Sequence, residues 1–186
     1  MDERLQQACA ALDAENAGDP FGKEVDHAER AVAWLARLRP DAPEELLLAA
    51  RGHHVRRWEI PRSSEPEGRA GYLRWKRRLQ QHHAEIVGRV LRDVGYDDDM
   101  VARVQSIVRK ERLRTDPDVQ SFEDALSLVF LETQLRDLAT KLDDDHLVDV
   151  LAKTLRKMTP AGRAAAASLT YDDRSRTLVE RAIAAV

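Results

Sequence analysis

One long segment, residues 116–142, constrains the fold of this chain more than any other. Its apolar residues, among them Phe122, Leu128 and Leu135, would cover nearly the whole circumference of a helix. Such a helix must be buried on almost every side. The rest of the chain must therefore supply the elements that surround it.

Eight further segments carry apolar residues at helical spacing, and turn residues separate them. These segments are residues 3–15, 24–38, 44–51, 72–93, 100–112, 144–157, 160–168 and 173–185. Alternating patterns of the kind that predict strands are absent from the sequence. With 186 residues the chain can bury a substantial core. We therefore expect one all-α domain of about eight or nine helices spanning residues 1–186.

Composition limits the classes of function. A net charge of −3 gives no general affinity for nucleic acid, although basic residues cluster locally. No apolar run is long enough to span a bilayer, and the charged N-terminus has no signal-peptide pattern. The single cysteine, Cys9, excludes an internal disulfide. These features favour a cytoplasmic protein that binds a small anion.

The stretch most suggestive of chemistry follows the third helical segment. An apolar run ends at Gly52, and His53 and His54 come next. Adjacent residues point about 100° apart on a helix, so both histidines can face one cavity only near a helix end. Histidine is the commonest metal ligand, and arginine is the preferred partner of phosphate. The stretch therefore suggests a site for a phosphorylated molecule, while a surface loop of mixed charge remains the alternative.

Other ionisable residues lie on or beside apolar helix faces. Asp124 shares a sector with Leu128 and Leu131, where a carboxylate needs a partner because an unpaired buried charge is costly. His27 lies at the edge of an apolar face, where it could equally be a packed histidine. Glu111 could ligate a metal or simply pair with a neighbouring basic residue.

Together these side chains indicate a metal site beside anion-binding groups. Oxygen and imidazole ligands suit manganese, iron, cobalt, nickel or zinc better than calcium. A divalent metal can polarise a phosphoryl oxygen and activate water. The basic residues that could neutralise phosphate charge are Arg56, Arg57, Arg62, Lys110 and Arg112.

The order of these residues resembles the HD-domain phosphohydrolase superfamily. In that superfamily an early histidine, a His-Asp pair after a leucine- and alanine-rich run, and a late aspartate ligate a metal. The resemblance makes His27 the first ligand, His53 the histidine of the pair and Asp124 the late aspartate. His54 stands where the paired aspartate belongs, and it brings no negative charge. His83 and Glu111 resemble the additional ligand positions of two-metal members.

A closer resemblance covers nearly the whole chain. The sequence is similar to an uncharacterised family filed as a domain of unknown function, some of whose members carry the label glutamyl-tRNA synthetase. The matching stretches are Asp19-Pro20, Arg51 to Arg62, Tyr72 to Trp75, Val108 to Glu111, Phe122 to Asp124, Leu128 to Glu132 and Lys157-Met158. The sequence lacks the strand-and-glycine pattern of a synthetase.

We therefore expect a metal-dependent phosphohydrolase of HD-like architecture, with nucleotides as the expected substrate class. The site would be built from about residues 19–130, with the helices of residues 143–186 packed against it. The expected metal ligands are His27, His53, His54 and Asp124, with His83 as an additional ligand, and Glu59 or Glu111 would transfer the proton.

Two alternatives remain open. A site with His54 in place of aspartate could bind a nucleotide or another anion without catalysis, and a few HD-like proteins are iron enzymes that use oxygen. The exposed faces of the last helices could also serve a homodimer.

Overall fold

The computed structural model describes residues 3–186, and every regular element in that range is helical. Its ten α-helices are α1 (Glu3–Asn16), α2 (Glu24–Leu38), α3 (Glu44–Gly52), α4 (Gly68–Val94), α5 (Asp98–Val108), α6 (Pro117–Thr133), α7 (Leu135–Ala139), α8 (Asp144–Leu155), α9 (Pro160–Ser168) and α10 (Asp173–Ala184). Two short 3₁₀ turns, η1 (Arg57–Glu59) and η2 (Arg62–Ser64), lie between α3 and α4. The predicted all-α fold is confirmed.

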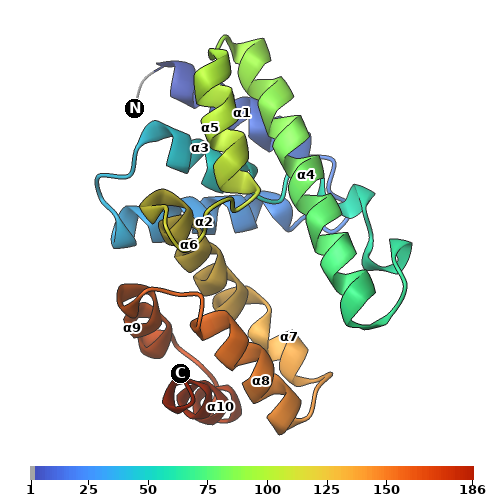
Figure 1. Ribbon diagram of the computed structural model, residues 1–186, viewed down its shortest axis with the longest axis vertical. Coiled ribbons are helices and arrows are strands. Elements are labelled where there is room, and N and C mark those ends of the chain that lie inside the picture. Colours follow the sequence, from blue (N-terminus) through green and yellow to red (C-terminus); the bar gives the residue numbers. More distant parts are fainter. Residues whose placement is uncertain (1–2) are drawn as a thin grey trace.

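Helix α6 is the central element. It runs from the group formed by α1 to α5 towards α7 to α10, and it packs against α2, α3 and α9 (Figure 1). Phe122 and Leu128 on this helix are at most 1% exposed. Burial of two such side chains contributes roughly 3–6 kcal/mol relative to leaving them in water. The apolar circumference of this segment therefore organises the fold as expected.

Two helices end earlier than their apolar patterns predict. The segment 116–142 is divided at Gln134, whose φ of −121° interrupts the helical backbone between α6 and α7. Helix α5 stops at Val108, because Lys110 and Arg112 adopt left-handed backbone conformations with φ of 58° and 56°. Neither break is marked by glycine or proline, the residues that usually signal one.

The helix starts follow the expected chemistry. Asp97, Asp116, Asp143 and Asp172 each accept a hydrogen bond at the first turn of the helix that follows, and Thr159 does the same for α9. These side chains satisfy backbone N–H groups that have no partner within the helix. The acidic runs before α5 and α8 are thus capping segments.

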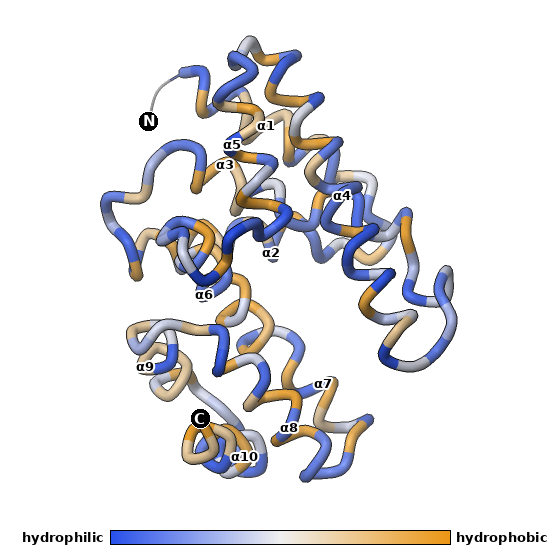
Figure 2. Tube along the Cα trace, viewed as in Figure 1, coloured by the Kyte–Doolittle hydropathy of each residue, from blue (hydrophilic) through white to orange (hydrophobic). Residues whose placement is uncertain are grey.

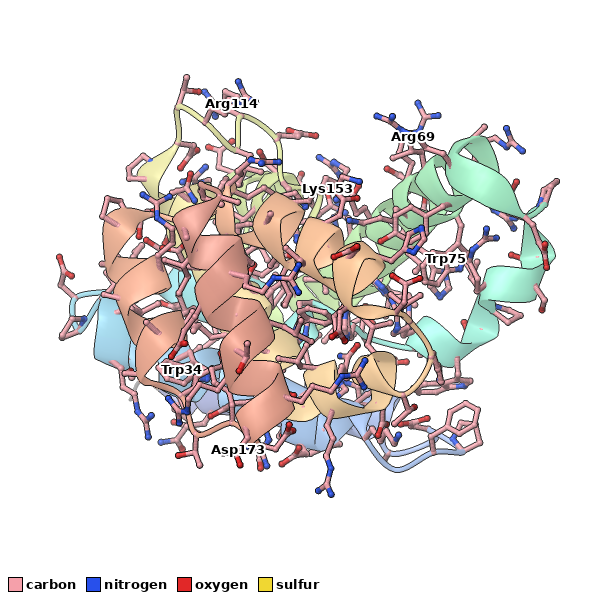
Figure 3. All side chains as sticks on the ribbon, turned by 90° about the horizontal axis from the view of Figure 1, so that it is seen from below. Trp34, Arg69, Trp75, Arg114, Lys153 and Asp173 are labelled. Atoms are coloured by element: carbon pink, nitrogen blue, oxygen red, sulfur yellow. The ribbon has the colours of Figure 1, made fainter. Side chains whose placement is uncertain are left out.

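Each helix carries both polar and apolar residues, as expected of amphipathic elements (Figure 2). Charged side chains such as Arg69, Arg114 and Lys153 lie on the outside of the molecule (Figure 3). Within residues 3–186, no helix combines the length and the apolar character needed to cross a membrane.

The end of α3 is positioned by a close approach to α4. A Cβ atom at Gly52 would lie 2.4 Å from Cγ2 of Val87, so only glycine fits at this crossing. Because His53 and His54 follow directly, this contact also fixes where the histidine pair begins.

We expect Gly52→Ala to lower the free energy of unfolding by about 1–3 kcal/mol, the usual cost of overpacking a core. Urea denaturation would measure the change. Gly18→Ala is the matched control, because the nearest atom to its new Cβ lies at 3.6 Å. Equal stability of the two variants would contradict the assigned helix crossing.

Candidate functional site

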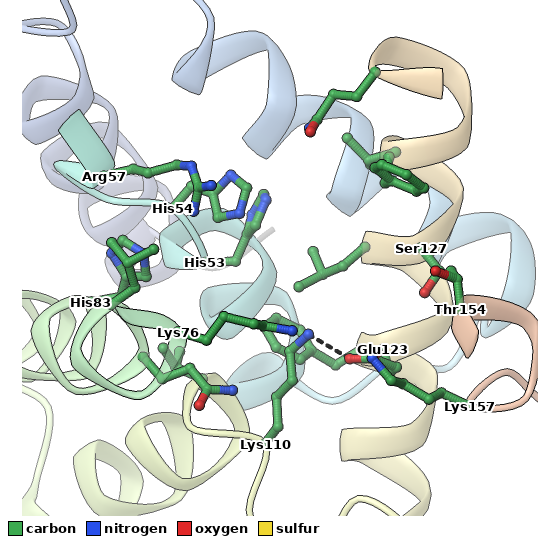
Figure 4. Close-up of a pocket in the computed structure, with 18 of the residues that line it drawn as sticks. His53, His54, Arg57, Lys76, His83, Lys110, Glu123, Ser127, Thr154 and Lys157 are labelled. Carbon is green, nitrogen blue, oxygen red and sulfur yellow. Dashed lines mark hydrogen bonds and ion pairs between the residues drawn. The ribbon is translucent and has the colours of Figure 1, made fainter. Parts of the chain in front are cut away.

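A cavity of about 560 Å³ lies between α4 and α6, and residues of α7 and α8 also line it (Figure 4). Aromatic and aliphatic side chains, among them Trp75 and Phe130, form much of its wall. Its ionisable lining residues are His53, His54, Arg57, Tyr72, Lys76, His83, Lys110, Glu123 and Lys157. We refer to it as the cationic cavity, for the reason given below.

Two histidines of this cavity are fixed in one tautomer by backbone carbonyls. His53 donates from Nδ1 to the carbonyl of Ala50, and His83 donates from Nδ1 to the carbonyl of Val55, each at 2.8 Å. Both rings therefore keep the lone pair on Nε2. Burial lowers the pKa of His53 well below its usual value and that of His83 to about 4, so both rings are neutral at neutral pH. Nε2 of His83 is buried and has no hydrogen-bond partner among the described residues.

His54 belongs to a different group, which also includes two residues of α2. Oε2 of Glu24 lies 3.1 Å from Nδ1 of His54 and 3.5 Å from Nδ1 of His27. One ligand atom from each of the three residues lies within 4.8 Å of the others. Glu24 and His27 share one face of α2 because they are three positions apart along the helix. Burial, with a further contribution from Arg57, lowers the pKa of His54 and keeps it in the neutral form that binds metals.

Of residues 3–186, four cationic side chains and one carboxylate line the cavity. Figure 4 shows Lys76 and Lys110 directed towards Glu123 from one side and Lys157 from the other. Lys110 forms an ion pair with Glu123, and Nζ of Lys157 lies 3.5 Å from the second carboxylate oxygen. Burial by itself would raise the pKa of Glu123, but the two lysines lower it, so this carboxylate is ionised.

Lys76 and the fourth cation, Arg57, form no ion pair with a carboxylate among the described residues. The guanidinium of Arg57 lies over the ring of Trp75 at 4.9 Å, and the ammonium of Lys76 lies 5.7 Å from the ring of Tyr72. Burial and then the neighbouring lysines lower the pKa of Lys76 to about 8. The cavity thus holds more positive charge than its own carboxylate can neutralise.

A second cavity, of about 630 Å³, opens beside the first, and we refer to it as the outer cavity. The two cavities share Arg57, Phe130, Gln134 and Leu138 as lining residues. Glu24 and His27 line the outer cavity, whereas His54 lines the cationic one. The carboxylate–histidine group therefore lies at the boundary between the two.

Comparison with known proteins places the chain in a family. The family model described as Domain of unknown function (DUF4202) matches residues 6–179. The chain belongs to this family. The match reaches from α1 into α10 and includes every residue that lines either cavity. No curated protein and no solved structure is similar enough to the chain to count as a match.

In this DUF4202 protein, six of the residues selected from the sequence line one of the cavities. They are His27, His53, His54, Arg57, His83 and Lys110. The helix end at Gly52 brings both members of the histidine pair to the cationic cavity, as the sequence predicts.

Asp124 lies elsewhere, lining neither cavity. Its carboxylate accepts hydrogen bonds from the backbone N–H of Thr159 at 2.9 Å and from the hydroxyl of Thr159. Gly162 makes room for it, because a Cβ there would lie within 3 Å of the carboxylate. The side chain is buried and partnered as its position on α6 requires, but its partner is the start of α9 rather than the histidines.

The two glutamates expected to transfer protons also lie outside the cavities. Glu59 is 3.3 Å from Arg56 and 3.2 Å from Nε2 of His82. Glu111 accepts a hydrogen bond from Arg109 at 2.7 Å and is exposed. Both carboxylates are committed to neighbouring cations near the surface.

Three of the expected phosphate-binding arginines have other roles. Arg56 pairs with Glu15 on α1. Arg62 donates to two backbone carbonyls of its own loop at 2.9 and 3.1 Å and so holds that loop together. The side chain of Arg112 is 70% exposed, lies 3.8 Å from the carboxylate of Asp116 and lines neither cavity.

Four residues of the site were missed by sequence reasoning: Glu24, Lys76, Glu123 and Lys157. A signal existed for Glu24, which precedes His27 by one helical turn. A weaker one existed for Lys76, which lies beside the apolar stripe that contains Trp75. Glu123 precedes Asp124, whose position in an apolar sector is the stronger signal in the sequence. Nothing in the sequence around Lys157 links it to a cavity.

The structural role of Asp124 can be tested with a double-mutant cycle. We expect Asp124→Ala and Thr159→Ala each to cost about 1–3 kcal/mol, the penalty for leaving buried polar groups unpaired. The double variant should cost less than the sum, since both substitutions remove the same contact. Urea denaturation of the four proteins measures these energies, and strict additivity would contradict the assigned contact.

Proposed function

We propose that this protein is a metal-dependent phosphohydrolase of HD-like architecture that acts on a phosphorylated small molecule, with nucleotides as the expected class. One observation carries the proposal. A compact group of one carboxylate and two histidines adjoins a cavity in which four cationic side chains face a single carboxylate. Ligands of a transition metal and groups that neutralise phosphate thus occur side by side.

The residues present fit a transition metal. Glu24, His27 and His54 would hold manganese, iron, cobalt, nickel or zinc through one oxygen and two nitrogen atoms. His54 stands where the resembled superfamily has the aspartate of its His-Asp pair, and it brings no negative charge. Glu24 on α2 would supply that charge instead. A metal held there would polarise a phosphoryl oxygen and activate water.

The phosphate group would be held by the cations of the cavity. Within residues 3–186, Arg57 and Lys76 form no ion pair with a carboxylate, so an anion between them would neutralise partly buried positive charge. Lys110 and Lys157 already share Glu123 and would add weaker attraction.

The same cavity offers groups that can orient or transfer a proton. Nε2 of His53 and Nε2 of His83 can accept a hydrogen bond from water or from a substrate hydroxyl. With a pKa of about 4, His83 is a weak base and would orient its partner rather than deprotonate it. Lys76, with a pKa of about 8, is suited to donate a proton to a leaving oxygen near neutral pH.

A second candidate function is anion binding without catalysis. Among the described residues, Glu123 is the carboxylate that lines the cationic cavity, and its two lysine partners leave it a poor base. A cavity without a free carboxylate favours a module that binds a nucleotide or another anion and leaves it intact.

Metal binding and hydrolysis separate these functions. After incubation with manganese, cobalt, nickel, zinc and iron(II), we expect near-stoichiometric metal in the wild type and release of phosphate from at least one nucleotide. Glu24→Gln should weaken metal binding by roughly 10–100-fold or more, as loss of a metal-site group commonly does. Glu29→Gln is the matched control, because Glu29 is an exposed carboxylate on the same helix.

Each other outcome decides against the hydrolase. Absence of metal from the wild type would rule out a metal-dependent reaction. Bound metal with nucleotide binding but no phosphate release would favour the binding module. Iron as the main metal, again without phosphate release, would favour oxygen chemistry.

The role of Lys76 predicts a pH dependence. Sulfate is a suitable probe because its own charge stays constant from pH 7 to 10. Since the pKa of Lys76 is about 8 in the folded protein, sulfate affinity should start to fall above pH 8, by at most about tenfold per pH unit. The charged and titratable groups near Lys76 include Arg57, Lys110, Glu123 and Lys157, together with Tyr72, whose ring lies 5.7 Å from its ammonium group.

In Lys76→Met we expect weaker sulfate binding at pH 7 and a flatter pH profile by calorimetry. Without sulfate, the variant should melt at a higher temperature than the wild type at pH 7. The pKa of Lys76 is lower in the folded protein than in the unfolded chain, so its protonated form destabilises the folded state. This destabilisation is complete below about pH 8, and it decreases as the pH rises towards the pKa of lysine in the unfolded chain. Arg77→Met, at the exposed neighbouring position, is the control. An unchanged sulfate affinity in Lys76→Met would refute the role.

A further inference from the structure

Phe21, an exposed aromatic residue at the outer cavity, lies in a turn that is held by hydrogen bonds to Asp19. The side chain of Phe21 is 73% exposed and lines this cavity. The carboxylate of Asp19 accepts hydrogen bonds from the backbone N–H groups of Phe21, Lys23 and Glu24 at 2.9, 2.7 and 3.1 Å. Gly22 completes the turn with a φ of 64°. These hydrogen bonds hold the backbone of the turn, so the ring of Phe21 extends into solvent from a backbone that is itself held in place.

The charges of the outer cavity differ from those of the cationic cavity. Carboxylates of Glu24, Asp26 and Asp137 line it together with the cations Lys23, Arg57 and Lys141. Positive and negative groups are therefore balanced, and nothing here favours a second anion. Thr133 and Gln134 add neutral hydrogen-bonding groups. The outer cavity is chemically suited to a neutral group that carries hydrogen-bond donors.

We infer that the outer cavity binds the planar ring of the substrate, with Phe21 as its stacking surface and the acidic side chains as acceptors for amino or hydroxyl groups. The two cavities share a wall, and the carboxylate–histidine group lies at their boundary. A molecule with its phosphate in the cationic cavity and its ring in the outer cavity would place the bond between them at that boundary. A nucleoside phosphate whose base carries amino groups has this chemistry, whereas an inorganic polyphosphate or an aliphatic phosphate does not.

The position of the phosphate rests on the proposed function, whereas binding of the ring can be tested separately. Adenosine 5′-monophosphate, adenosine and ribose 5-phosphate are the probes, because they carry ring and phosphate, ring alone, and phosphate alone. Calorimetry with Phe21→Ala should show about 5- to 100-fold weaker binding of the two adenine-containing probes, the usual effect of losing an aromatic partner of a base. Binding of ribose 5-phosphate should stay unchanged.

Two further variants make the result specific. Phe21→Trp should retain adenosine binding, since it keeps an aromatic face. Leu73→Ala, which removes another exposed apolar side chain that lines neither cavity, should leave all three affinities unchanged.

The results with Phe21→Ala distinguish this inference from the hydrolase proposal. If phosphate release fails in every protein but Phe21→Ala still selectively weakens adenine binding, the ring site stands without catalysis. If the wild type binds ribose 5-phosphate as tightly as the nucleotide, or if Phe21→Ala weakens all three probes equally or none, the ring site is refuted.

Discussion

The candidate site depends on one buried carboxylate. Glu123 is 4% exposed, and it brings together Lys110 from the segment after α5 and Lys157 from the segment after α8. Without it, four cations would face one another across a partly buried space, where repulsion is poorly screened. The carboxylate of Glu123 offsets part of this repulsion, and the cavity still holds positive charge that no carboxylate neutralises within residues 3–186. One carboxylate thus reduces the repulsion between the cations and leaves the cavity with a net positive charge.

The histidines illustrate how backbone geometry prepares side chains for chemistry. The end of α3 and the turn after it provide the carbonyls of Ala50 and Val55, which fix the rings of His53 and His83 before any ligand binds. Burial keeps these rings neutral. A ligand would therefore meet oriented lone pairs without first reorganising the site, which is the condition under which polar groups contribute most.

The sequence predicted most helices well because they carry apolar residues at helical spacing, and α5, α6, α8, α9 and α10 also begin at a side chain that caps the first turn. It did not reveal the interruptions at Lys110 and Gln134, where backbone conformation departs from helix without glycine or proline. The sequence predicted only those parts of the candidate site that form a local pattern. A histidine pair at a helix end is a local pattern, whereas the partner of Asp124 is Thr159, 35 residues later, and no local pattern reveals such a contact. Burial of Asp124 was predictable, but the group that satisfies it was not.

Two adjacent carboxylates on α6 contact different parts of the chain. Asp124 is tied to the first turn of α9, while Glu123, the next residue, anchors the lysines of the cationic cavity. Any shift of α9 that turned α6 about its axis would therefore move both side chains together. A substitution in the last helices could then shift the lysines of the cationic cavity without replacing a residue that lines it.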